Sequence, residues 1–279
     1  MHGNTSNLTD SQNKCIDCDL ALAHLEHFGK RHGLSLPGAH YTLAVQMGIE
    51  RPNHTTNSVH AKRKKVEGGN CTVKTGEEID RLFSEQISFP PRDKYGLALP
   101  TPSGGNLGSP RKPPSQRNQS LLHAGLEALK KRGVELWSSQ VRLPCEHLGC
   151  APVLDLLGWI PTKGHLVIVE VKTSGSAAMK KAKIGPDIIL PVQYKTGDLV
   201  NMCISDTWKH RHLLQLSLQC HCARSILGQD RGVPYPEIEG LLLVLSGYEN
   251  AHVRTLPTEY KNVAWDVLLS KQTRETCRV

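Results

Sequence analysis

Three charged residues lie close together in a stretch whose pattern predicts a β-hairpin. Segment 153–173, VLDLLGWIPTKGHLVIVEVKT, has a short apolar run and then an alternating run rich in β-branched residues, with a proline and a glycine in the turn between them. A four-residue turn centred on residues 162–163 places Asp155 opposite Glu170, with β-carbons about 5 Å apart. Lys172 follows Glu170 by two positions, so both side chains share a face of the strand.

This grouping of two carboxylates and an ammonium can do chemistry on a phosphate. Opposed carboxylates repel each other unless a cation lies between them. Their hard oxygens suit Mg²⁺ or Mn²⁺, which leaves ligand positions to water and phosphate. An ammonium beside the metal can hold the attacking water or offset charge on the phosphate. The alternative is an exposed hairpin face that carries an ordinary glutamate–lysine pair.

The pattern resembles the PD-(D/E)XK nuclease superfamily, in which a hairpin carries Asp on one strand and (D/E)-x-K on the next. Asp155 and Glu170-Val171-Lys172 stand at those positions, with Leu154 where the family name has proline. The likeness covers roughly residues 120–257 and is strongest to the RecB-like, CRISPR-associated and mitochondrial exonuclease branches and to nuclease-like proteins of large DNA viruses. It implies an α/β, restriction-endonuclease-like fold with a mixed β-sheet flanked by helices. It also implies one or two metal ions on Asp155, Glu170 and the Val171 carbonyl.

Two helices before the hairpin carry further candidates. Residues 119–131 predict a helix capped by Ser120 and ended by Gly133. Its His123 and Glu127 share a face and resemble the first motif of RecB-like nucleases, which makes Glu127 a possible metal ligand; the alternative is a surface pair.

Residues 75–89 predict an earlier helix with a Thr75–Glu78 capping box. Its Gly76 and Asp80 are similar to a Gly-x-x-(aliphatic)-Asp helix of related nucleases. We expect Glu78 and Asp80 to be solvent-facing or capping charges, with an active-site position as the less favoured alternative.

A long helix over 207–227 has a polar stripe that includes Arg211, Gln215 and Gln219. RecB-like nucleases carry Gln-x-x-x-Tyr on the corresponding helix. Gln215 matches that glutamine, whereas Gln219 stands where the tyrosine would be. Gln215 is therefore the candidate to order water or a phosphate oxygen, and the alternative is a plain polar helix face.

The chain of 279 residues has a formal charge of +8, which suits a polyanionic partner such as DNA. A basic run predicts either a phosphate-binding arm or a nuclear-import signal, with a solvated loop as the alternative; it consists of Lys62, Arg63, Lys64 and Lys65. Basic residues beside the hairpin and on the long helix are further candidates for phosphate contacts: Lys180, Lys181, Lys183 and Arg211.

The expected organisation is a basic N-terminal region with a short helix (1–74), a helix followed by a Pro/Gly/Ser-rich linker (75–118), and a nuclease domain (119–272). Within the nuclease domain we predict strands at 134–143, in the hairpin, at 240–247 (GLLLVLSG) and at 252–257 (HVRTLP). We also predict a short extended piece at 188–194 and a closing helix over 258–271.

No apolar run is long enough to span a membrane and no signal peptide is visible, so we expect an intracellular protein, nuclear or mitochondrial in a eukaryotic host. Nine cysteines then predict reduced thiols. Zinc on Cys15, Cys18, His27 and His32 is a weaker alternative to free side chains. The cysteine spacing does not predict an iron–sulfur cluster.

The sequence thus predicts a metal-dependent deoxyribonuclease, more an exonuclease than an endonuclease, in viral or organellar replication, recombination or repair. Its partners would be single- or double-stranded DNA and replication or recombination proteins, with no membrane. The competing hypothesis is a catalytically silent DNA-binding subunit of a replication or packaging complex on the same fold.

Overall fold

A computed structural model describes residues 25, 73–87, 114–145, 148–174, 183, 185–229, 236–247 and 249–268. Its centre is a five-stranded mixed sheet in the order β1-β2-β3-β6-β7, with β3 and β6 parallel and the other neighbours antiparallel. The strands are β1 (Glu135–Arg142), β2 (Val153–Ile160), β3 (His165–Ser174), β6 (Ile238–Ser246) and β7 (Asn250–Thr255).

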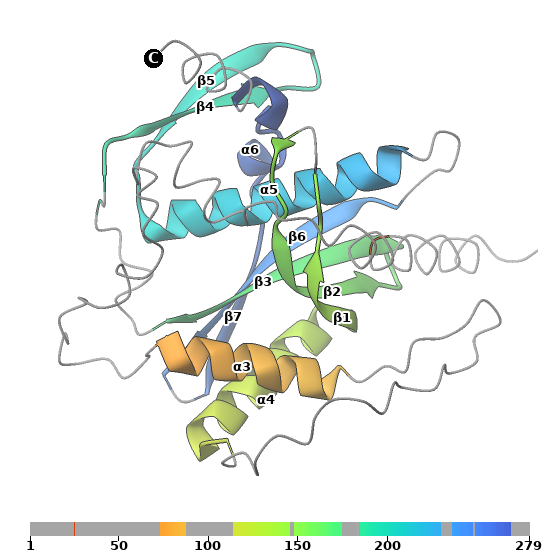
Figure 1. Ribbon diagram of the computed structural model, residues 1–279, viewed down its shortest axis with the longest axis vertical. Helices are drawn as coiled ribbons and strands as arrows, with labels where there is room; N and C mark the ends of the chain where they lie inside the picture. Colours follow the sequence, from red (N-terminus) through yellow and green to blue (C-terminus); the bar gives the residue numbers. More distant parts are fainter. Residues whose placement is uncertain are drawn as a thin grey trace, which may run out of the picture.

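Helices cover both faces of this sheet, as Figure 1 shows. One face packs against α3 (Val73–Gln86) and α4 (Gln116–Lys131), and the other against α5 (Trp208–Gln229), with α6 (Thr258–Lys261) beside it. The alternation of β3 explains the two layers, because successive side chains of a strand point to opposite faces. The even-numbered Leu166 and Ile168 join the α5 core, and the odd-numbered Val167 and Val169 join the α3–α4 core. The predicted mixed α/β fold is confirmed.

The β2–β3 hairpin has the predicted register. Its pairs run from Ile160 with His165 to Leu156 with Val169. The turn closes through two N–H groups that donate to the Ile160 carbonyl, at 3.1 Å from Lys163 and 2.9 Å from Gly164. Gly164 has φ 63°, a conformation that favours glycine. The paired ladder therefore ends immediately before Asp155 and Glu170.

The helix boundaries correct several expectations. Helix α3 begins at Val73, so Thr75 lies inside it and is not its cap, and it ends at Gln86 before the predicted 89. Helix α4 begins three residues earlier than predicted because Ser115, not Ser120, is the N-cap: its side chain accepts a hydrogen bond from the Asn118 N–H. The predicted C-terminal end is correct, since Gly133 has φ 71° directly after the helix.

A second, two-stranded sheet was only half predicted. The extended piece at 188–194 is β4 (Ile188–Gln193), but it pairs with a strand that the sequence pattern did not predict, β5 (Leu199–Ile204). The predicted closing helix is interrupted beside it: Val263 pairs with Val192, and the Ala264 N–H donates to the Pro191 carbonyl at 2.8 Å. This pairing ends α6 at Lys261, and a further helical turn follows at 265–268.

The β4–β5 hairpin also carries the large apolar side chains that stand out at the surface of the described part, Ile189, Tyr194, Leu199 and Val200. None of the helices in the described ranges has the length and apolarity that a membrane crossing requires.

Candidate active site

Asp155 lies where the backbone pairing of β2 with β3 ends, and its side chain accepts a hydrogen bond from the β3 backbone. The Val171 N–H donates to Asp155 Oδ2 at 2.7 Å. The N–H and C=O of one strand residue point to the same side, so the Val171 carbonyl also faces β2. On β1, Gln140 lies between the residues paired with Leu154 and Leu156 and has φ 53°, a left-handed conformation rare for a residue with a side chain. The sheet is thus locally irregular around this carboxylate.

Glu170 is completely buried on the face of β3 that packs against α5. Gln219 of α5 donates through Nε2 to Glu170 Oε2 at 2.7 Å and to the Val153 carbonyl at 2.9 Å. The second carboxylate oxygen of Glu170 forms an ion pair with the Lys172 ammonium. Gln219 therefore ties α5 to both strands of the hairpin and fixes the orientation of the Glu170 carboxylate.

Burial and mutual repulsion dominate the electrostatics of the hairpin acids. Burial, followed by the negative charge of Glu170, holds the pKa of Asp155 well above its usual value, although the Lys172 ammonium opposes this shift. Burial alone would lower the pKa of Lys172, but the surrounding carboxylates, led by Glu170 and Asp155, outweigh it and raise that pKa. Lys172 therefore keeps its proton and its positive charge. The carboxylates around it outnumber this one ammonium, so the site lacks positive charge.

A third carboxylate comes from α3. A Cβ added at Gly76 would lie 3.4 Å from Thr173 Oγ1, so this helix runs close to the end of β3. One turn later, burial raises the pKa of Asp80 to about 6; Glu170 and Glu77 raise it too, and Lys172 lowers it. Asp80 therefore belongs to the same electrostatic cluster, which corrects the favoured expectation of a solvent-facing charge.

The neighbouring acid of α3 has a different task. Glu78 Oε2 accepts a hydrogen bond from Asn118 Nδ2 at 2.6 Å, and Asn118 is buried near the start of α4. Glu78 thus joins the two helices of this layer, in place of the predicted capping box with Thr75. The contact holds α3 in the position that brings Asp80 to the site.

Three other predicted site residues lie on helices α4 and α5: His123, Glu127 and Gln215. Of the predicted first motif, His123 is exposed and Glu127 is half-buried on α4; the helix carboxylate that acts on Asp155 is Asp80. Gln215 is half-buried on α5, and its expected role in ordering water or a phosphate oxygen stays a prediction; the hydrogen bond to Glu170 is made one helical turn later, by Gln219. The sequence favoured Gln215 because the nucleases that it resembles have tyrosine where Gln219 stands. The signal that points to Gln219 is a glutamine buried on a helix opposite a buried strand glutamate, since each needs the other as a hydrogen-bond partner.

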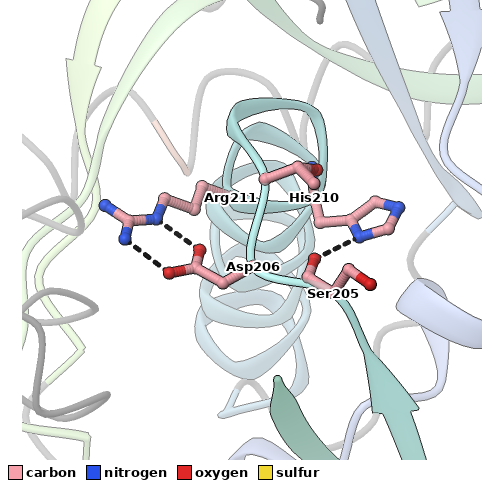
Figure 2. Close-up of polar contacts among 5 residues, drawn as sticks. Ser205, Asp206, His210 and Arg211 are labelled. Carbon is pink, nitrogen blue, oxygen red and sulfur yellow. Dashed lines mark hydrogen bonds and ion pairs between the residues drawn. The ribbon is translucent and has the colours of Figure 1, made fainter. Parts of the chain in front are cut away.

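The basic residues that the structure describes are partly compensated. Figure 2 shows the Arg211 guanidinium against Asp206, which it contacts through Nε and Nη2, each at 2.6 Å; Asp206 is only 1% exposed. Lys183 forms an ion pair with Asp187 at 3.0 Å. Each of these charges is engaged by a carboxylate, and the expected role of Arg211 and Lys183 as phosphate ligands stays a prediction. Lys180, Lys181, the basic run 62–65 and the possible zinc ligands of the N-terminal region lie outside the described residues.

The donor set fits a hard divalent cation. Asp155, Glu170, Asp80 and the Val171 carbonyl offer oxygen atoms only, and the raised pKa values of two of these acids show charge that a cation would relieve. Within the described ranges, no three side chains of His, Cys, Asp or Glu gather closely enough to enclose a metal ion by themselves. A cation here would keep water or phosphate among its ligands, as Mg²⁺ usually does.

Comparison with known proteins adds little. No protein-family model matches the chain, and no curated protein matches it. Ten chains among solved structures do match. One is the crystal structure of a "Putative exonuclease" from Eubacterium rectale, with a TM-score of 0.36 and 11% identity over 100% of this chain and 85% of that chain.

Proposed function

We propose that this chain is a metal-dependent nuclease of the PD-(D/E)XK type that hydrolyses phosphodiester bonds in DNA. The observation that carries the proposal is the convergence of Asp155, Glu170 and Lys172 at the end of the β2–β3 ladder, with the pKa of Asp155 raised by burial and by Glu170. Buried like charges cost stability, and a structural scaffold has no need of them.

Each residue of the site has a distinct task. Asp155 and Glu170 would hold Mg²⁺ or Mn²⁺ together with the Val171 carbonyl and Asp80. The metal, when bound, supplies a water of lowered pKa and offsets charge on the phosphate. Gln219 keeps the Glu170 carboxylate in one orientation through its 2.7 Å hydrogen bond. Lys172, held as an ammonium, orients the attacking water and stabilises the negative charge that builds on the phosphate.

The direct test incubates the full-length chain with circular plasmid, linear duplex and single-stranded DNA, in Mg²⁺ or Mn²⁺ and with EDTA. Cleavage that needs the metal and disappears in Asp155→Asn is expected. Resistance of the circular plasmid combined with shortening of the linear DNA would identify an exonuclease. A matched control is Lys163→Met at the opposite end of the hairpin, where Lys163 pairs with Glu239 at 3.0 Å; it should cut like wild type.

Two outcomes count against the proposal. DNA binding without cleavage in any of these metals would favour the catalytically silent subunit. Equal cleavage by wild type and Asp155→Asn would point to a contaminating nuclease or to another site.

A further inference from the structure

Strands β1 and β2 change faces at the same place in the sheet. On β2, Leu156 belongs to the α3–α4 core, whereas Leu154 belongs to the α5 core, although residues two apart on a regular strand share a face. On β1, Val141 pairs with Leu154 and lies in the α5 core too. Ser139 pairs with Leu156, and its hydroxyl donates to the Ser84 hydroxyl of α3 at 2.9 Å. Each strand therefore inverts between these two pairs.

The residues at the inversion are Gln140 and Asp155, which stand opposite each other where the register of β1 with β2 skips a pair. Gln140 has φ 53° and is, within the described ranges, the one residue other than glycine with a positive φ. The two-fold alternation of a strand needs extended backbone at every residue, so a left-handed residue re-aims the side chains that follow it. Strand β2 inverts with β1, because opposed residues of an antiparallel pair share a face.

Strand β3 does not change faces. Val169 and Val171 both belong to the α3–α4 core, so β3 alternates regularly past the point where β2 inverts. A continued register would place Leu154 opposite Val171, yet these two residues belong to cores on different faces. The ladder therefore ends at the pair of Leu156 with Val169. The Asp155 carboxylate occupies the seam beyond it and accepts the Val171 N–H at 2.7 Å.

The side chain of Gln140 does not account for its backbone conformation. It is exposed, so packing of this side chain does not impose the left-handed form, and glycine, asparagine and aspartate adopt that form far more readily than glutamine. An unfavourable conformation persists where the surrounding structure holds it, and such residues concentrate at functional sites. Both neighbours hold this one: Ser139 is bonded to α3, and Val141 is buried in the α5 core.

We propose that Gln140 is a positioning residue of the candidate active site, whose left-handed backbone inverts β1 and β2 and so directs the Asp155 carboxylate into the seam with β3. The role belongs to the backbone of residue 140, and its amide side chain takes no part. The placement of Asp155 is independent of any metal or substrate. The consequence for DNA cleavage rests on the proposed function.

The test replaces Gln140 in the full-length chain with residues that differ in their tolerance of left-handed backbone. Gln140→Gly and Gln140→Asn accept this conformation, whereas the β-branched side chain of Gln140→Val opposes it. The measurement is amide hydrogen exchange of Val171 in metal-free protein, because the bond to Asp155 protects that N–H. Exchange should match wild type in the first two variants. It should be faster by about 10-fold or more in Gln140→Val, the effect of losing one hydrogen bond.

Cleavage of DNA in Mg²⁺ should follow the same order. Gln140→Gly and Gln140→Asn should cut like wild type, and Gln140→Val should lose activity. The matched control is His252→Val, which places the same side chain at an exposed position of β7, the opposite edge strand; it should change neither exchange nor cleavage. If wild type itself does not cut DNA, the proposed function fails, while the exchange of Val171 still tests the role of Gln140.

Three results would overturn the positioning role. Wild-type protection of Val171 in Gln140→Val would show that the Asp155 bond does not need a left-handed residue. Loss of cleavage in Gln140→Gly, with Val171 still protected, would assign the role to the glutamine side chain. If Gln140→Val fails to fold, the φ of Gln140 in wild type, measured from backbone NMR couplings and chemical shifts, decides: an extended Gln140 contradicts the proposal.

Discussion

The Asp155 carboxylate accepts a hydrogen bond from the Val171 N–H just beyond the last pair of the β2–β3 ladder, Leu156 with Val169. The side chain therefore replaces a backbone partner and keeps the two strands together beyond their last pair. As a result the carboxylate is held by the sheet itself and needs no metal to be placed. The sheet thus keeps a buried negative charge in place, which is the feature that the proposed cation would neutralise.

The first prediction concerns that charge. Asp155→Asn keeps an oxygen for the Val171 N–H and removes the charge, so metal-free Asp155→Asn should melt no lower than wild type at neutral pH. Mg²⁺ should raise the melting temperature of wild type, because it binds the folded form, and should do little for Asp155→Asn or Glu170→Gln. Thermal melts with and without Mg²⁺ measure both effects. A large Mg²⁺ shift in either variant would contradict the assigned ligands.

The second prediction separates metal binding from catalysis. Lys172→Met removes the ammonium that competes with a cation for Glu170, so the Mg²⁺-induced rise in melting temperature should persist or increase. Cleavage should be lost, because nothing else in the described site orients the water. A variant that lost both properties would show that Lys172 builds the site and does not serve the chemistry.

The third prediction distinguishes two glutamines of α5. Gln219→Ala should reduce cleavage by about 10–100-fold, the range for residues that orient a metal ligand. It should also destabilise the fold by about 1–3 kcal/mol, since Glu170 Oε2 and the Val153 carbonyl each lose a donor. Gln215→Ala, the position favoured from sequence, serves as the control and should stay near wild type in both assays. The opposite ranking would restore the original assignment to Gln215.

The fourth prediction is a pH dependence of metal-free stability. The pKa of Asp80 rises from 3.8 to about 6 on folding, so the folded state binds this proton more tightly than the unfolded chain does. The corresponding stabilisation is present at low pH and is lost as the pH rises from about 4 through 6. Asp80→Asn should therefore gain stability relative to wild type over that interval, measured as urea midpoints without metal. Glu85→Gln, at an exposed position of α3, should follow the wild-type curve.

The fifth prediction tests the basic run outside the described residues. Conversion of Lys62, Arg63, Lys64 and Lys65 to alanine should weaken DNA binding equally across sequences. It should also reduce the salt dependence of binding to duplex DNA, by a slope of about 0.9 for each phosphate that the variant no longer neutralises. Fluorescence anisotropy at several salt concentrations measures this. An unchanged slope with loss of nuclear import would identify the run as a targeting signal only.

The sequence was most informative where local rules determine the structure. The turn chemistry between β2 and β3 set the register, and alternation then placed Glu170 and Lys172 on one face. The buried strand β6 and the long helix α5 also follow directly from their apolar patterns. All of these features depend on residues close together in the chain.

What the sequence did not predict depends on tertiary packing. Asp80 reaches the site because Glu78 bonds to Asn118, a contact across 40 positions that no periodicity reveals. Whether Gln215 or Gln219 reaches Glu170 depends on the position of α5 along β3. The packing of buried side chains between the helix and the sheet determines that position. Strand β5 was missed because its residues are largely exposed and carry no alternation toward a core.

The separations of these contacts along the chain have a consequence for folding. Asp155 and Val171 are 16 positions apart within one hairpin, whereas Gln219 is 49 positions from Glu170, and β3 finds its parallel partner β6 only after α5 has been made. Local contacts form before distant ones because their loops cost less entropy to close. Asp155 and Glu170 are therefore brought together early in folding, before α5 supplies the hydrogen bond from Gln219. During synthesis, divalent cations would meet a half-built site before the helix that completes it has left the ribosome.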